Sequence, residues 1–112
     1  MDVQLQKGFY RHFKHDPKGD PGNYYYEVLN VAHNKDLNLS VVCYRPLYKS
    51  YVYELGRQWD FKPVADWFKP LPDGNTRYTL IIDRDEIKQL EQLKQNLYTT
   101  EPHVLTITLP AA

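Results

Sequence analysis

Four histidines carry the imidazole rings most suited to chemistry in this sequence: His12, His15, His33 and His103. His12 and His33 fall in two predicted neighbouring strands, near Tyr44 and Tyr48. Paired imidazoles beside tyrosine hydroxyls could transfer protons, bind a metal or hydrogen-bond a ligand. If the protein is an enzyme, these two histidines are the expected acid and base. The competing interpretation is structural, because histidines also tie loops to backbone carbonyls. Since no third ligand or paired carboxylate has a convincing place, neither a metal nor a cofactor is expected.

A larger group of aromatic and basic residues is the best candidate for ligand binding. Aromatic faces stack on planar rings, and Arg and Lys supply the charge-assisted hydrogen bonds that a phosphate or carboxylate requires. Such a surface suits a small anionic, nucleotide-like ligand, a nucleic-acid segment or a short peptide in an aromatic groove. The alternative is that many of these aromatic side chains only fill the core. The candidate residues are Tyr10, His12, Lys14, Tyr26, His33, Arg45, Tyr48, Arg57, Trp59 and Lys62.

Several familiar catalytic signatures are absent from the sequence. It has no Gly-rich phosphate loop, no His-Glu-x-x-His, no Cys pair and no Gly-x-Ser-x-Gly. P-loop nucleotide hydrolysis and zincin-type proteolysis are therefore not expected. Asp83, Asp85 and Glu86 resemble a metal site in composition, but their place at the start of a predicted helix favours capping. Cys43 lies in an apolar run and is expected to be an inert core residue.

Size and charge limit the classes of function. The 112 residues suit one domain with its own core. Lys and Arg number 14, as do Asp and Glu, so the chain lacks the broad positive field that supports nucleic-acid binding. The N-terminus shows no signal peptide, and no apolar run is long enough for a membrane span. We expect a cytoplasmic protein, in its own cell or a host, without a membrane partner.

Short alternating segments in the first two thirds predict β-strands. Residues 8–14, 24–33 and 39–45 form three expected strands, and a loop rich in proline and glycine at 15–23 separates the first two. In the first strand, Phe9, Arg11 and Phe13 are expected on one face and Tyr10 and His12 on the other. In the second strand, one face is expected to carry Tyr24, Tyr26, Val28 and Ala32, and the other Tyr25, Glu27, Leu29 and Val31.

The rest of the chain predicts one helix among further short strands. A fourth strand is expected at 51–54. Pro63 lies in the aromatic stretch 59–68, and because it lacks an N–H it is not expected in a central strand of the sheet. The C-terminal part predicts a strand at 77–82, a helix at about 84–98 and a strand at 103–109. For the helix, Asp83 is the expected N-cap and Glu86 completes a capping box. An apolar stripe should join the helix to the sheet; its residues are Ile87, Leu90, Leu93 and Leu97.

Four ordered blocks of residues resemble the DUF1653 family. That family's pattern is approximately Gly, Tyr, His and Lys on the first strand, Tyr-x-Val and then His on the second, Val-Val-Tyr with Leu-Tyr on the third, and Arg-Pro near the end. The resemblance covers about residues 7–69 and implies a small SH3-like β-barrel with no established activity. The matching residues are Gly8, Tyr10, His12, Lys14, Tyr26, Val28, His33, Val41, Val42, Tyr44, Leu47, Tyr48, Lys62 and Pro63.

The sequence also departs from the family's pattern. The loop at 15–23 is longer than the resemblance implies, Lys62 stands where the family has Arg, and Asn34 and Lys35 replace other polar residues. The tail from residue 76 to 112 has no counterpart in the resemblance. A function that depends on the loop or the tail would be particular to this chain.

Together these features predict a mainly β protein, a small SH3-like β-barrel with a C-terminal β-α-β extension, forming one domain over residues 1–112. Our first hypothesis is a non-enzymatic binding module for a small anionic or aromatic ligand or a short peptide. The second is a small enzyme acting on a nucleotide-derived substrate through His12 and His33. The third is an interaction protein in which the apolar stripe of the tail completes a homo-oligomer.

Overall fold

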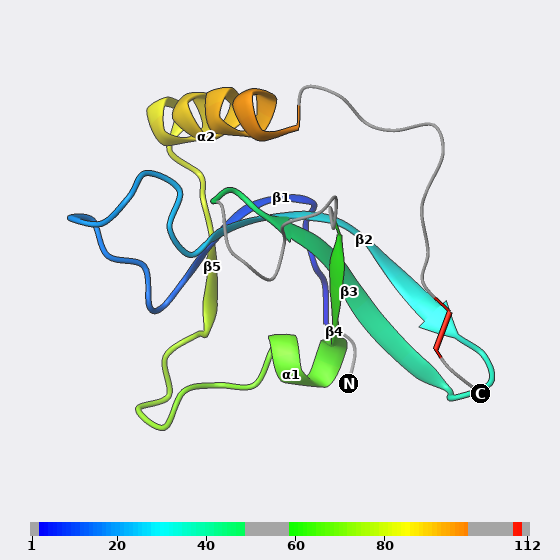
Figure 1. The fold of residues 1–112 in the computed structure, drawn as a ribbon. Coiled ribbons are helices and arrows are strands. Elements are labelled where there is room, and N and C mark those ends of the chain that lie inside the picture. Colours follow the sequence, from blue (N-terminus) through cyan, green and yellow to red (C-terminus); the bar gives the residue numbers. More distant parts are fainter. Residues whose placement is uncertain (1–2, 49–58, 99–108, 111–112) are drawn as a thin grey trace.

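The computed structural model describes residues 3–48, 59–98 and 109–110, which form a five-stranded antiparallel sheet and two helices. The sheet curls into a half-barrel, and its strand order is β4-β3-β2-β1-β5. Figure 1 shows the longer helix, α2, on one side of the sheet and the short helix α1 on the other. The strands are β1 Gly8–His12, β2 Tyr25–Asn34, β3 Leu39–Pro46, β4 Asp60–Pro63 and β5 Tyr78–Leu80.

The predicted mainly β class is confirmed, and the first three strands lie where the alternation placed them. The strand expected at 77–82 is shorter, β5, and pairs with β1 at the sheet edge. The strand expected at 51–54 lies outside the described residues. So does nearly all of the strand expected at 103–109.

Alternation in β1 divides the core between the two faces of the sheet. We call them the α1 face and the α2 face after the helix that covers each. The buried cluster of the α1 face consists of Tyr10, Tyr26, Val28, Val42, Tyr44 and Trp67. The buried cluster of the α2 face consists of Phe9, Tyr25, Leu47, Ile81 and Leu90.

The alternation predicted for β2 is wrong in its second half because the strand contains a β-bulge. Val28 pairs with Tyr44, but the next pair joins Asn30 to Cys43, so Leu29 is an extra residue. An extra residue reverses which face each later side chain takes. Val31 therefore pairs with Val42, on the face that we expected for Ala32.

Pro63 ends an edge strand, as its missing N–H predicts. Among the described strands, β4 pairs only with β3, so β4 is an edge strand of the sheet. A four-residue helix, α1 Val64–Trp67, follows at once and was not predicted. This turn places Trp67 in the α1-face cluster, where only 3% of its surface is exposed.

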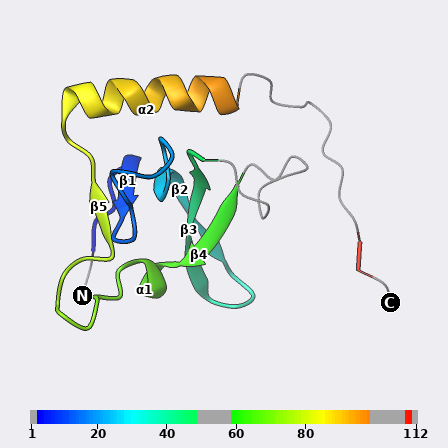
Figure 2. The same cartoon turned by 60° about the vertical axis from the view of Figure 1, so that its left-hand side comes forward.

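Helix α2, Arg84–Leu97, confirms the predicted helix and its N-cap: the Asp83 side chain accepts a hydrogen bond from the Glu86 N–H at 2.9 Å. The Glu86 carboxylate, however, accepts from the Tyr25 hydroxyl at 2.5 Å on the α2 face, instead of completing the capping box. Figure 2 shows α2 running across the direction of the strands. No helix in the described part of the chain is long and apolar enough to cross a membrane.

The apolar stripe of α2 packs within the chain. Leu90 is buried in the α2-face cluster, and Ile87 and Leu93 pack against it. The stripe therefore joins the helix to the sheet of its own chain, as expected, and the homo-oligomer stays a prediction.

Candidate functional site

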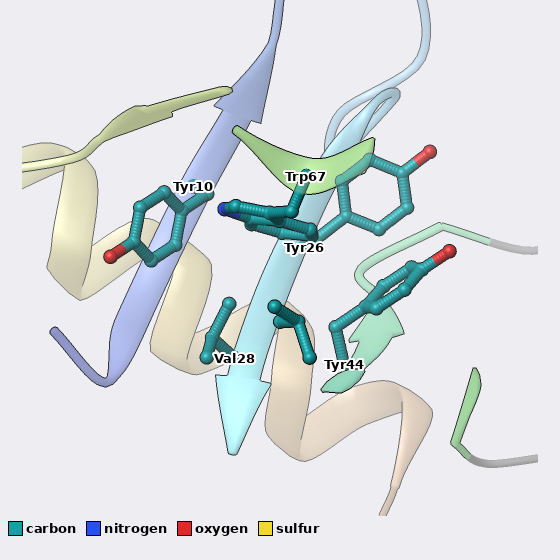
Figure 3. Close-up of a cluster of buried hydrophobic side chains, with 6 residues drawn as sticks. Tyr10, Tyr26, Val28, Tyr44 and Trp67 are labelled. Atoms are coloured by element: carbon teal, nitrogen blue, oxygen red, sulfur yellow. The ribbon is translucent and has the colours of Figure 1, made fainter. Parts of the chain in front are cut away.

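The structure brings together half of the ten predicted ligand-binding residues. They share the α1 face of the sheet, where aromatic rings are concentrated. Figure 3 shows part of this cluster, with Trp67 between Tyr10 and Tyr44. The five residues on this face are Tyr10, His12, Tyr26, Tyr48 and Lys62.

His12 is the buried polar centre of this region. It ends β1, and its imidazole stacks on the Tyr24 ring at a centroid distance of 5.4 Å. The Tyr78 ring meets it edge-on at 5.0 Å. The backbone N–H of Lys14 donates to Nδ1 of His12 at 3.2 Å. Since Nδ1 accepts a hydrogen bond, the neutral ring carries its proton on Nε2.

The surroundings of His12 keep its ring neutral. Burial lowers the pKa of the imidazole to about 4, and positive charges nearby add to the effect. In decreasing order these charges belong to Lys62, Lys14 and Arg77. A neutral imidazole surrounded by cations makes this part of the α1 face electropositive.

Tyr78 connects the cations to the aromatic cluster. Lys62 donates from Nζ to the Tyr78 hydroxyl at 2.9 Å. The Tyr78 ring stacks on Trp67 with a centroid distance of 3.7 Å and an interplanar angle of 3°. Tyr10 meets the Trp67 ring edge-on at 5.6 Å. Because each ring packs against another, the aromatic surface is held in one orientation.

A hollow of about 530 Å³ opens beside this stack, and we call it the Arg77 hollow. Its volume lies within the usual range for small-molecule sites. Among the described residues that line it, Arg77 is the only charged one; its Nε donates to the Lys69 carbonyl at 3.2 Å. His12 does not line it. The lining side chains used below are Tyr10, Trp67, Phe68, Arg77 and Tyr78.

The hydroxyls of Tyr26 and Tyr48 lie 2.8 Å apart at another part of the α1 face. Burial raises the pKa of Tyr48, so its hydroxyl stays protonated at neutral pH and can donate. Neither tyrosine lines the Arg77 hollow. Their role on this face is to pack and hydrogen-bond beside His12, whose ring meets that of Tyr26 at 6.4 Å.

The predicted pairing of His12 with His33 is wrong. The His12 N–H bonds to the Tyr24 carbonyl, so the end of β1 lies beside the start of β2. His33 lies nine residues further along the β2 strand, roughly 30 Å away at about 3.3 Å per residue. It is exposed, and its Nδ1 lies 3.0 Å from the Ser40 hydroxyl. These two side chains cannot act together on one substrate.

Arg45 and Trp59 belong to a different environment, beneath helix α2. Arg45 is 4% exposed, and its guanidinium lies 4.1 Å from the Trp59 ring centroid. Lys14 is exposed, 5.9 Å from the Phe13 ring centroid. Arg57 lies outside the described residues.

Sequence reasoning missed Trp67, Arg77 and Tyr78 as site residues. Tyr78 begins a strand that pairs with β1, so His12 lies opposite Tyr78, and Arg77 directly precedes this strand. Their aromatic and basic types resemble those of the chosen group, but no local pattern shows which distant strand they join. Among residues 3–48 and 59–98, no three His, Cys, Asp or Glu side chains form a group that could hold a metal ion.

The fold places this chain among the mainly β proteins: an antiparallel sheet curls into a half-barrel, and a helix follows it. The family model DUF1653, described as a protein of unknown function, matches residues 8–71. The chain belongs to the DUF1653 family, as the resemblance predicted. No curated protein matches it.

A solved structure supports the same fold. It is the crystal structure of a protein belonging to DUF1653 from Bordetella bronchiseptica, with a TM-score of 0.51 and 22% sequence identity. The similarity covers 69% of this chain and 87% of that one. The family match ends at residue 71, so Arg77, Tyr78 and helix α2 lie beyond it.

Proposed function

We propose that this protein is a non-enzymatic binding module that holds a small anionic ligand with a planar ring in the Arg77 hollow. One observation carries the proposal: a hollow with aromatic walls has a single charged residue in its described lining, and that residue is a cation. A guanidinium matches a phosphate or carboxylate, and the exposed part of Phe68 offers a face for a planar ring.

The wider electrostatics support the same ligand class. Lys14, Lys62 and Arg77 form no ion pair with a carboxylate in the described part of the chain. Their positive potential therefore remains available to attract an anion, at a range limited by the Debye length of about 8 Å in physiological salt. Lys62 reaches the hollow indirectly, through its hydrogen bond to Tyr78.

Binding without turnover fits the chemistry on this face. His12 is buried and neutral, and it does not line the hollow. A general acid or base must lie within hydrogen-bond reach of the proton that it moves. The described lining has no carboxylate or histidine that could take this role.

The test is a titration with adenosine 5′-monophosphate, followed by amide chemical shifts, with adenosine as the uncharged comparison. We expect saturable shifts at Phe68, Arg77 and Tyr78 with the nucleotide and much weaker binding of adenosine. Arg77→Gln should weaken nucleotide binding roughly ten- to a hundredfold, since a hydrogen bond to a charged group contributes about 1.5–3 kcal/mol. Arg84→Gln, which removes an exposed charge at the start of α2, is the matched control.

A second variant tests the aromatic wall. Phe68→Leu should weaken binding, and Phe61→Leu, an exposed phenylalanine outside the hollow, should not. Phosphorus NMR of the recovered nucleotide should show no chemical change. The proposal is overturned if nucleotide, other phosphates and carboxylates cause no shifts at the hollow, or if adenosine binds equally well. Conversion of the ligand by the protein would contradict the non-enzymatic part.

A further inference from the structure

A second hollow lies on the other face of the sheet, between the loop after β1 and helix α2. Its volume is about 580 Å³, again in the range of small-molecule sites. One wall is the loop between β1 and β2, and the other is helix α2, which lies beyond the family match. We call it the loop–helix hollow. The lining side chains that carry the argument are His15, Asp16, Asp20, Tyr25, Glu86 and Leu90.

The loop wall is held in place by its own hydrogen bonds. The Asn23 side chain accepts from the Asp16 N–H at 2.9 Å and donates to the Asp16 and Asp20 carbonyls. Gly22 has a φ of 82°, and a Cβ at this position would collide with the Leu47 carbonyl and approach a methyl group of Leu93. The loop therefore sits directly against Leu47, which follows β3, and against α2, so the hollow exists before any ligand arrives.

The floor of the hollow is apolar. Leu90 is 2% exposed and Tyr25 is 9% exposed. The His15 ring lies against the Tyr25 ring at a centroid distance of 4.3 Å. The Tyr25 hydroxyl donates to the Glu86 carboxylate, so its hydrogen-bonding capacity as a donor is already used within the protein. Such a floor suits the hydrocarbon part of a ligand.

Hydrogen-bond acceptors outnumber donors around that floor. Nδ1 of His15 lies 2.6 Å from the Asn23 carbonyl, which only accepts, so Nδ1 donates and Nε2 of the neutral ring is an acceptor. The lining includes the carboxylates of Asp16, Asp20 and Glu86, and no described lining residue is Lys or Arg. Glu86 is partly balanced by Arg11 at 3.6 Å, which leaves the two aspartates as the main negative charges.

We propose that the loop–helix hollow binds a small organic cation, an ammonium group on a short apolar chain. The apolar floor would bury the chain, and the aspartates and the His15 acceptor would receive the N–H donors. The charged residues that line the loop–helix hollow are acidic, whereas the charged residue that lines the Arg77 hollow is a cation. The two sites are distinct, so either proposal can fail without the other.

The experiment titrates the whole chain with n-butylammonium to millimolar concentration and follows amide chemical shifts. We expect saturable shifts at Asp20, Tyr25 and Leu90 that weaken with added salt. Butan-1-ol, of similar shape and uncharged, should bind more weakly, and butyrate should not bind. Nα-acetyl-lysine methylamide then separates the possible sources: equal binding indicates a lysine side chain of a partner, and weaker binding indicates a free amine.

Two pairs of variants locate the site. Asp20→Asn should weaken n-butylammonium binding roughly two- to fivefold, the upper range for an exposed ion pair, and Asp36→Asn in the β2–β3 turn should not. Gln89→Trp, which fills the hollow from α2, should abolish binding, whereas Gln95→Trp on the same helix should not. Both glutamines are exposed, so neither change removes core packing.

The proposal is overturned by any of three results. The first is the absence of shifts at the hollow with n-butylammonium. The second is equal binding of butan-1-ol or butyrate, which would show that charge plays no part. The third is unchanged affinity in both Asp20→Asn and Gln89→Trp, which would place the amine elsewhere on the protein.

Discussion

Glu27 and Arg45 form a hydrogen-bonded ion pair beneath helix α2, with Nε of Arg45 donating to Oε1 of Glu27 at 2.9 Å. Only 9% and 4% of their surfaces are exposed. Lys94 donates to the other carboxylate oxygen at 2.7 Å, from a position 67 residues away in sequence. The Arg45 guanidinium also lies 4.1 Å from the ring centroids of Trp59 and Tyr98. One buried carboxylate therefore links the sheet to α2.

Removing the Glu27 charge should destabilise the fold. Glu27→Gln removes the negative charge from the buried ion pair with Arg45, and breaking a buried pair typically costs about 3 kcal/mol. Urea unfolding followed by tryptophan fluorescence measures the change. Glu91→Gln, an exposed change on α2, should leave the free energy of unfolding within about 0.5 kcal/mol of the parent. Equal stability of the two variants would show that the pair contributes nothing net.

His12 should make stability depend on pH. Its pKa of about 4 in the folded protein lies below the ordinary value of about 6.5, so folding favours the neutral ring. The corresponding stability is complete above about pH 6.5 and is lost as pH falls toward 4. The loss should be about 2 to 3 kcal/mol by linkage.

Two substitutions isolate this contribution from that of the acidic residues. His12→Asn should reduce the loss of unfolding free energy between neutral pH and about pH 4, because the titrating group is gone. His33→Gln, at an exposed site, should keep the parent slope. If all three proteins lose the same stability, His12 titrates normally in the folded state.

Gly22 and Gly74 allow backbone strain to be separated from steric collision. Both have positive φ, 82° and 87°, so alanine at either position is strained by about 1 kcal/mol. At Gly74 an added Cβ meets nothing within 4 Å, but at Gly22 it collides with the Leu47 carbonyl. We expect Gly22→Ala to lower the unfolding free energy by about 2 to 4 kcal/mol and Gly74→Ala by about 1 kcal/mol. Similar losses in urea titrations would mean that the loop moves aside without cost.

The N-cap of α2 should contribute a measurable share of helix stability. Asp83→Ala removes the acceptor for the Glu86 N–H and should lower the unfolding free energy by about 1 kcal/mol. Gln95→Ala, at an exposed position near the other end of α2, is the control and should be neutral or slightly stabilising. A loss in the control as large as that in Asp83→Ala would refute the capping role.

Local patterns predicted the elements well where neighbouring residues decide the structure. The opposite faces of Phe9 and Tyr10 follow from the two-residue period of a strand, and the cap at Asp83 follows from an unpaired N–H three residues later. The four blocks also placed the chain in its family. The bulge at Leu29 escaped prediction because a bulge is a mismatch between two strands, and one strand's sequence does not show it.

The candidate site was only half predicted, for a similar reason. Residue types pointed to Tyr10, His12 and Lys62, which do share the α1 face. The same criterion selected Arg45, which lies on the α2 face, and His33, which lies far along β2. Type and spacing do not encode which face a residue takes once strands from distant parts of the chain have paired.

The sequence by itself determined the mainly β class, the long helix α2 after the sheet and the surplus of aromatic side chains, because these depend on composition, local propensity and periodicity. Only the tertiary structure decided that Arg77 and Tyr78 join His12, and that the loop and α2 enclose a second hollow. These relationships join residues some 65 positions apart, which only the pairing of β1 with β5 and the packing of α2 on the sheet bring together.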